Sequence, residues 1–148
     1  MDQSSRNVQG KILIVEDDSE FVGVIQRFLK LFSAQLSVES VASGEEAFVL
    51  LKDHSYDFVI VDYTLAGRAN GLYVWEYCRK KYPTIPLLMI SGLSVEQFLS
   101  MMVGHKDFPR FLPKPFMRGD LQRVMNDVFP SQEGASVQVQ NKPIRRAS

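Results

Sequence analysis

Residues Asp57 to Gly67 read DFVIVDYTLAG, so four apolar side chains stand in a row between two aspartates. A short apolar run with polar residues at both ends is typical of a strand that is buried on both faces. This strand, Phe58–Val61, would end by delivering the carboxylate of Asp62 into the loop that follows. We therefore predict that Asp62 is held rigidly at the carboxyl end of a core strand.

The same pattern of a short strand followed by a helix recurs on either side of this stretch. Apolar and β-branched runs alternate with segments whose apolar residues have helical spacing. The predicted strands are residues 12–15, 36–41, 58–61, 85–90 and 108–112, and the predicted helices are residues 19–32, 44–52, 72–81, 95–102 and 117–129. The side chains predicted to face inward from the first helix are Phe21, Val24, Ile25, Phe28 and Phe32.

This alternation predicts an α/β fold in which a five-stranded parallel sheet is covered by helices on both faces. Right-handed crossovers would wind the chain doubly. Sites in such sheets lie beyond the carboxyl ends of the strands. Residue types that carry chemistry do gather at those ends, namely Glu16, Asp17, Asp62, Ser91 and Lys114.

The composition is that of an ordinary globular chain. Its 148 residues suit one domain, and Lys plus Arg and Asp plus Glu both number 17, so bulk charge does not indicate binding to nucleic acid. The one cysteine, Cys78, cannot form an internal disulfide, which fits a reducing compartment. No apolar run approaches the roughly 20 residues of a membrane-spanning helix. We expect a cytoplasmic protein without membrane insertion.

The two ends of the chain differ in composition from its middle. We expect residues 1–10 to be a flexible leader and residues 11–129 to be the folded domain. The polar, aperiodic residues 130–148 are expected to be a flexible tail or linker. On this interpretation, no output domain follows the last helix.

Three acids, Glu16, Asp17 and Asp62, are predicted to converge at one rim of the sheet. Two unit charges about 4 Å apart repel by roughly 4 kcal/mol at an effective dielectric constant near 20. Such a cluster needs a protonated carboxyl group or a bound cation, and oxygen ligands with open positions suit a hydrated Mg²⁺. The alternative, that each acid is a helix cap or a solvated loop residue, fits Asp17 and Asp62 less well because each follows a buried strand.

Lys114 and Ser91 complete the predicted site. Lys114 stands between two prolines, which restrict its backbone and leave open a cis Lys114–Pro115 bond. Ser91 precedes a glycine at the end of a strand, where a serine can equally be a turn or capping residue. Together these groups fit the acceptance of a phosphoryl group on Asp62, with the metal, the lysine and the hydroxyl stabilising the phosphoryl oxygens.

The segments VEDD, IVDYTLAG, MISG and FLPKPF, in this order and spacing, resemble the signature of bacterial response-regulator receiver domains, in particular single-domain regulators of the chemotaxis type. The resemblance implies a flavodoxin-like sheet in the order 2-1-3-4-5 with five helices. It implies phosphorylation of Asp62 by a histidine kinase, a histidine phosphotransfer protein or a small phosphodonor. It also implies Mg²⁺ as the cofactor, held by Asp17, Asp62 and the main-chain carbonyl of Thr64, with Glu16 acting through water.

The resemblance further implies a switch, in which Ser91 and Phe111 move when Asp62 is phosphorylated and shift the population between two packings. The readout face would be the fourth helix, the fifth strand and the fifth helix. Exposed apolar residues there would bind a downstream protein or a second copy of the chain. No enzymatic activity is expected beyond the domain's own phosphoryl transfer and slow dephosphorylation. The residues expected on the readout face are Phe98, Met101 or Met102, Phe108 and Arg110.

Departures from the family pattern leave alternatives open. The loop YTLAGRANG lacks the usual Met-Pro pair and is one residue longer, and Phe111 stands where tyrosine is commoner. A degenerate receiver that binds partners without phosphorylation is one alternative. Another is a phosphohydrolase with an aspartyl-phosphate intermediate, although such enzymes place an acid where this chain has Thr64.

Overall fold

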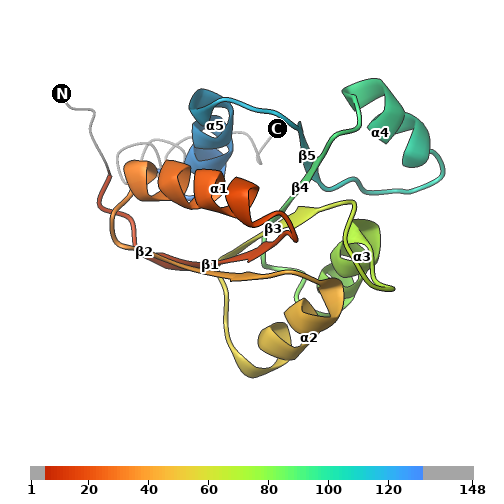
Figure 1. Ribbon diagram of the computed structural model, residues 1–148, viewed down its shortest axis with the longest axis horizontal. Coiled ribbons are helices and arrows are strands. Elements are labelled where there is room, and N and C mark those ends of the chain that lie inside the picture. Colours follow the sequence, from red (N-terminus) through yellow and green to blue (C-terminus); the bar gives the residue numbers. More distant parts are fainter. Residues whose placement is uncertain (1–5, 132–148) are drawn as a thin grey trace, which may run out of the picture.

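The computed structural model describes residues 6–131, which form a five-stranded sheet with helices on both faces (Figure 1). The strand order is β2-β1-β3-β4-β5 and every pair is parallel. The predicted fold and sheet order are therefore confirmed. In chain order, the elements are β1 Gly10–Val15, α1 Ser19–Phe32, β2 Leu36–Val41, α2 Gly44–Asp53, β3 Phe58–Asp62, α3 Gly71–Lys81, β4 Leu87–Ser91, α4 Val95–Met101, β5 Arg110–Pro113 and α5 Arg118–Val128.

The sheet separates two apolar layers. Side chains of β1 alternate between them, since Ile12 and Ile14 pack with α1 and α5 whereas Leu13 and Val15 pack with α2 and α3. Figure 1 shows α1 and α5 on one face of the sheet and α2 and α3 on the other. Burial on both faces explains why the central strands are apolar without interruption.

Two strands begin two residues later than predicted, because a proline precedes each. β4 begins directly after Pro86, and β5 begins directly after Pro109. A proline has no N–H to donate to the sheet, so it favours a strand start rather than a strand interior. β3 is longer than predicted at its other end, since Asp62 is its last residue and is only 4% exposed.

Helix α1 begins as predicted, but its inward face differs in part. The Asp18 side chain caps the helix, and the buried side chains are Val22, Ile25, Leu29 and Phe32. Val24, which we expected to face inward, is not among them. Phe21 and Phe28 instead contact Phe116, with ring centroids 5.4 and 6.5 Å away. Because α1 packs against both the sheet and α5, its apolar stripe is wider than one inward face.

Part of the predicted leader is tied to the domain. The backbone N–H of Arg6 donates to the carbonyl of Phe32 at 2.7 Å, and the N–H of Val8 donates to Ser33 Oγ at 3.0 Å. Residues 1–5 and residues 132–148 of the predicted tail lie outside the described residues. Within residues 6–131, no helix has the length and apolar character needed to cross a membrane.

Candidate functional site: an acidic cluster with a lysine

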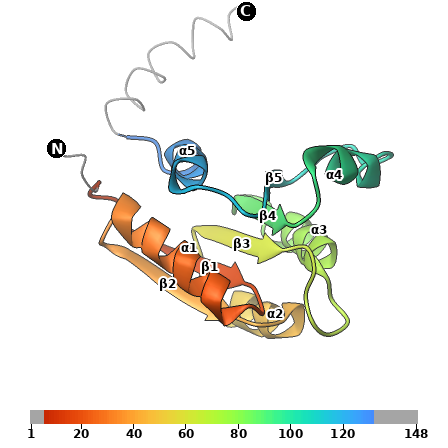
Figure 2. The ribbon, with the colours of Figure 1, turned by 45° about the horizontal axis from the view of Figure 1, so that its top comes forward.

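Three acidic side chains meet at the edge of the sheet where β1 and β3 end. Glu16 and Asp17 follow β1 directly, Asp62 ends β3, and the two strands pair in parallel. One carboxylate oxygen from each residue lies within 4.8 Å of the others. In Figure 2 the arrowheads of β1, β3 and β4 point toward this same edge. The topology of the sheet therefore brings together the acids that the sequence predicted to converge.

The ammonium group of Lys114 reaches the acids from the end of β5. Its Nζ lies 3.2 Å from Glu16 Oε1 and 3.2 Å from Asp62 Oδ2. The Lys114–Pro115 bond is cis, and the Lys114 backbone N–H donates to the Ser91 carbonyl at 2.6 Å. The amine thus faces the acidic cluster rather than bulk water.

The lysine compensates only part of the negative charge in the cluster. Burial is the main cause that raises the pKa of Glu16 to about 7; the hydrogen bond from the Asp18 N–H opposes this shift, and the charge of Asp62 adds to it. Burial would lower the pKa of Lys114, but the charges of Asp62 and Glu16 outweigh it and raise this pKa. The side chain of Asp17 is exposed and makes no hydrogen bond or ion pair with any of residues 6–131. Asp17 is therefore free to bind a cation.

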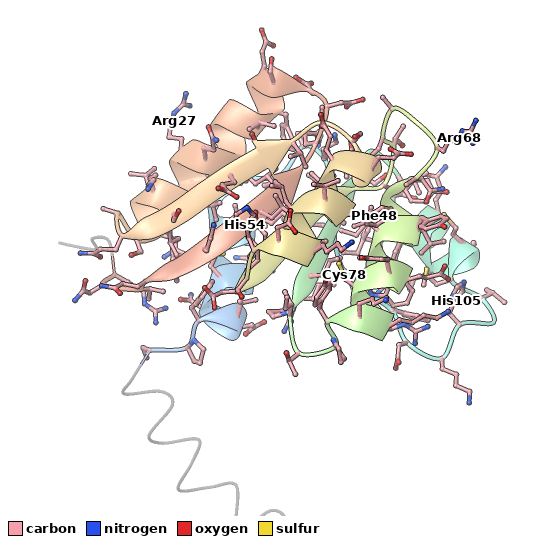
Figure 3. All side chains as sticks on the ribbon, turned by 90° about the horizontal axis from the view of Figure 1, so that it is seen from below. Arg27, Phe48, His54, Arg68, Cys78 and His105 are labelled. Atoms are coloured by element: carbon pink, nitrogen blue, oxygen red, sulfur yellow. The ribbon has the colours of Figure 1, made fainter. Side chains whose placement is uncertain are left out.

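The long loop after Asp62 is held by a residue that sequence reasoning missed. Glu45 of α2 accepts, through Oε2, the backbone N–H of Arg68 at 3.0 Å and that of Ala69 at 3.1 Å. Gly67 has a φ of 89°, which other residues rarely adopt. The Arg68 side chain itself points away from the domain (Figure 3). The loop is anchored through backbone N–H groups, which do not depend on the residue type. The only feature of the sequence that pointed to such a contact was the extra residue in the loop.

The two ends of this loop fix the backbone around Asp62. The Thr64 N–H donates to Asp62 Oδ1 at 3.2 Å. Gly71 begins α3 so close to the main chain of Asp62 and Tyr63 that a side chain there would collide with it. Its N–H donates to the Tyr63 carbonyl at 2.8 Å. The main chain at Thr64, from which the resemblance implies a metal ligand, is thus positioned next to Asp62.

Ser91 and Phe111, the predicted switch residues, lie on neighbouring strands β4 and β5. Ser91 is 1% exposed, and its hydroxyl accepts the Leu93 N–H at 3.1 Å. Phe111 is half-buried and stacks on Phe98 of α4, with ring centroids 4.1 Å apart and an interplanar angle of 10°. Phe111 therefore connects β5 to the inner face of α4.

The expected readout face is wrong for residues on the inner side of α4. Phe98 is 3% exposed and Met102 is 0% exposed, so both belong to the core and cannot form an exposed contact surface. Apolar residues occur on both sides of this short helix, so the pattern could not identify the inner one. The exposed large apolar side chains of this region are Val95, Leu99, Val103 and Phe108, and Arg110 is exposed beside them.

Comparisons with known proteins agree with this architecture. A profile described as the response regulator receiver domain matches residues 12–126. The transcriptional regulatory protein CpxR of Klebsiella pneumoniae is 31% identical over 108 residues, which are 72% of this chain and 43% of that protein. The chain spans about half the length of the curated relatives it matches.

Solved structures show the same fold. The response regulator receiver protein from Sinorhizobium medicae is 25% identical, with a TM-score of 0.67 and coverage of 80% of this chain and 92% of that one. The receiver domain of the sensor histidine kinase PA1611 from Pseudomonas aeruginosa is 24% identical, with a TM-score of 0.68 and coverage of 84% and 100%. That structure is described with a magnesium ion in its active-site cleft. The receiver-domain profile matches more than half of the 148 residues of this chain, and the chain therefore belongs to the response regulator receiver domain family of two-component systems.

Proposed function

We propose that this protein is a phosphorylation-controlled switch in which Asp62 accepts a phosphoryl group from a phosphohistidine. The donor would be a histidine kinase or a histidine phosphotransfer protein. One observation carries the proposal: the buried carboxylate of Asp62 is held at the end of β3 with the Lys114 ammonium group 3.2 Å away. A rigid carboxylate beside a fixed positive charge is suited to attack a phosphorus atom that carries anionic oxygens.

The donor atoms of the cluster fit Mg²⁺, which prefers carboxylate and carbonyl oxygens. Asp17, Asp62 and the Thr64 carbonyl would hold the ion, and Glu16 would act through water. When bound, the ion would neutralise negative charge on the carboxylates and on the phosphoryl oxygens. The exposure of Asp17 supports this assignment, because an ion can approach that carboxylate from solvent.

The phosphoryl transfer exchanges one bond for another. A carboxylate oxygen of Asp62 forms the new P–O bond while the P–N bond to the donor imidazole breaks, and the imidazole leaves with that electron pair. The Lys114 ammonium group, which now pairs with the Glu16 and Asp62 carboxylates, would then also pair with the phosphoryl oxygens. The Ser91 hydroxyl now accepts from Leu93, so its own hydrogen is available to donate to the phosphoryl group.

Phosphorylation would shift the domain between two packings. As Ser91 moves to the phosphoryl group, Phe111 would leave its stack on Phe98 and the α4-β5-α5 face would change. The exposed apolar side chains Val95, Leu99 and Val103, on α4 and just after it, would then bind a downstream protein or a second copy of this chain. On this proposal the protein acts in the cytoplasm and catalyses only its own phosphorylation and slow dephosphorylation.

An intact-mass measurement after incubation with acetyl phosphate and Mg²⁺ tests the proposal. We expect one phosphoryl group on the wild type and none on Asp62→Asn. Asp57→Asn is the matched control, because Asp57 precedes the other end of β3 and accepts the Lys11 N–H. A folded wild type that gains no mass would contradict the proposal and favour a receiver that binds its partners without phosphorylation.

A further inference from the structure

A cleft lies at the end of the sheet opposite to Asp62. It is formed by the last two turns of α3, the segment before β4 and the start of β5, and its volume is about 380 Å³. Pockets that bind small molecules have volumes of about 300–1,000 Å³. In Figure 3 the label of Cys78 marks α3, which forms one wall of the cleft. The label of His105 marks the loop between α4 and β5, which leads to the opposite wall. The cleft is therefore large enough for a small ligand and is separate from the acidic cluster.

Aromatic rings and prolines form part of the wall of the cleft. The rings of Trp75, Tyr82 and Phe108 line it together with three prolines. Trp75 is only 6% exposed, whereas Phe108 is 51% exposed although it is large and apolar. Aromatic rings favour stacked or edge-to-face contact with another ring. A ligand with an aromatic ring would cover the exposed ring of Phe108.

The polar side of the cleft is positively charged. Its lining includes Arg79 and Arg110 and no acidic residue. Arg79 is already engaged, because its guanidinium lies 4.9 Å from the Trp75 ring centroid and 3.3 Å from Asp107. Arg110 makes no ion pair or side-chain hydrogen bond with any of the described residues 6–131. The cleft thus presents one uncompensated guanidinium, a group that binds carboxylates in a bidentate manner.

We propose that this cleft binds a small aromatic carboxylate, whose ring lies against Phe108 and whose carboxylate pairs with Arg110. A series of aromatic contacts also connects the cleft to Phe111, one of the proposed switch residues. Phe108 meets the Phe98 ring edge-to-face at 6.5 Å, and Phe98 stacks on Phe111 at 4.1 Å. A ligand that orders Phe108 therefore favours one packing of this aromatic series, and by linkage it changes phosphorylation of Asp62. This second step rests on the proposed function, but binding does not.

Binding can be measured by NMR without phosphorylation, because Trp75 is the one tryptophan of the chain and gives a single indole N–H signal. The probes are 2-naphthoate and its uncharged analogue 2-naphthalenemethanol. We expect 2-naphthoate to move the Trp75 signal saturably, and to bind about tenfold more weakly to Arg110→Gln. Arg123→Gln is the control, since Arg123 is exposed on α5 outside the cleft. A dispersed amide spectrum verifies that each variant is folded.

Three outcomes would overturn the binding site: no saturable shift of the Trp75 signal, equal affinity for the alcohol, or equal affinity of Arg110→Gln. The link to the switch is tested by the rate of phosphorylation with acetyl phosphate in the presence of 2-naphthoate. That rate should change in the wild type and stay constant in Arg110→Gln. Binding without any change in rate would overturn the link and leave the site intact.

Discussion

Glu45 lies on α2 and yet fixes the conformation of the loop that follows Asp62. Its carboxylate accepts two backbone N–H groups that lie 23 and 24 residues further along the chain. The sequence could not reveal this contact, because it depends on a loop conformation that includes the positive φ of Gly67. Asp62, by contrast, was predictable, since the apolar run before it identifies the end of a buried strand.

We expect Glu45→Ala to slow phosphorylation by acetyl phosphate about tenfold, less than the roughly 100-fold that a 1 Å misplacement of a reacting group can cause, because Glu45 holds the loop beside Asp62 and not Asp62 itself. Without Glu45, the loop loses the hydrogen bonds to Arg68 and Ala69 and keeps the bridge between Ala66 and Ser43, the N-cap of α2. The measurement is the rate of mass gain. Glu46→Ala is the control, since Glu46 stands in the same helical turn but accepts the Ala42 N–H at 2.9 Å. Equal slowing by both variants would assign the effect to α2 rather than to the loop.

Cys78 is predicted to be chemically inert in the folded protein. It is buried in the layer between the sheet and α3, and burial raises the pKa of its thiol to about 12. A raised pKa keeps the thiol protonated in neutral and mildly alkaline buffer, and the thiolate is the reactive form. Dithionitrobenzoate should therefore release its chromophore only after denaturant is added. A rapid stoichiometric reaction of the native protein would show that the thiol is accessible.

Among the elements, α4 is the one whose orientation the sequence specified least. It spans seven residues, and its apolar side chains lie on both sides, with Phe98 buried and Val95 and Leu99 exposed. The longer helices were easier to predict because helical spacing dominates each of them, and the central strands because each is a short apolar run with polar or turn residues at its ends. A helix this short is not stable alone, so its position depends on packing and on its cap.

The cap of α4 should contribute measurably to stability. The Gln97 N–H donates to Ser94 Oγ at 3.1 Å, and the Ser94 N–H donates to Gln97 Oε1 at 2.8 Å. We expect Ser94→Ala to lower the free energy of unfolding by about 1 kcal/mol. Denaturant titration measures this, and hydrogen exchange should show faster exchange of the α4 amides. Ser100→Ala, at an exposed position of the same helix, should have little effect. If the two variants behaved alike, the cap would not be what holds α4.

At the scale of the whole molecule, the acidic cluster links distant parts of the chain across one edge of the sheet. Lys114 bonds to residues that stand 98 and 52 positions earlier in the sequence, and these contacts join the ends of β1, β3 and β5. The convergence was predictable from the rule that parallel strands present their carboxyl ends together. The division of charge was not predictable, because the folded arrangement decides that Lys114 pairs with Glu16 and Asp62 and leaves Asp17 uncompensated.

We expect this uncompensated charge to make the stability of the whole domain depend on a divalent cation. Repulsion between Asp17 and its two neighbours disfavours the folded state, so Asp17→Asn should raise the melting temperature when no metal is present. We expect Mg²⁺ to bind the folded state alone and to stabilise the wild type by about 1.4 kcal/mol at ten times its dissociation constant, whereas Asp17→Asn should gain little.

Scanning calorimetry with and without Mg²⁺ compares these proteins directly. Asp18→Asn is the matched control: it removes the same charge one residue along the chain, but Asp18 caps α1 and asparagine caps a helix equally well. Asp18→Asn should therefore keep the full response to Mg²⁺. If it lost that response as Asp17→Asn does, general screening of the acidic surface would explain the stabilisation. A response retained by Asp17→Asn would remove Asp17 from the metal site.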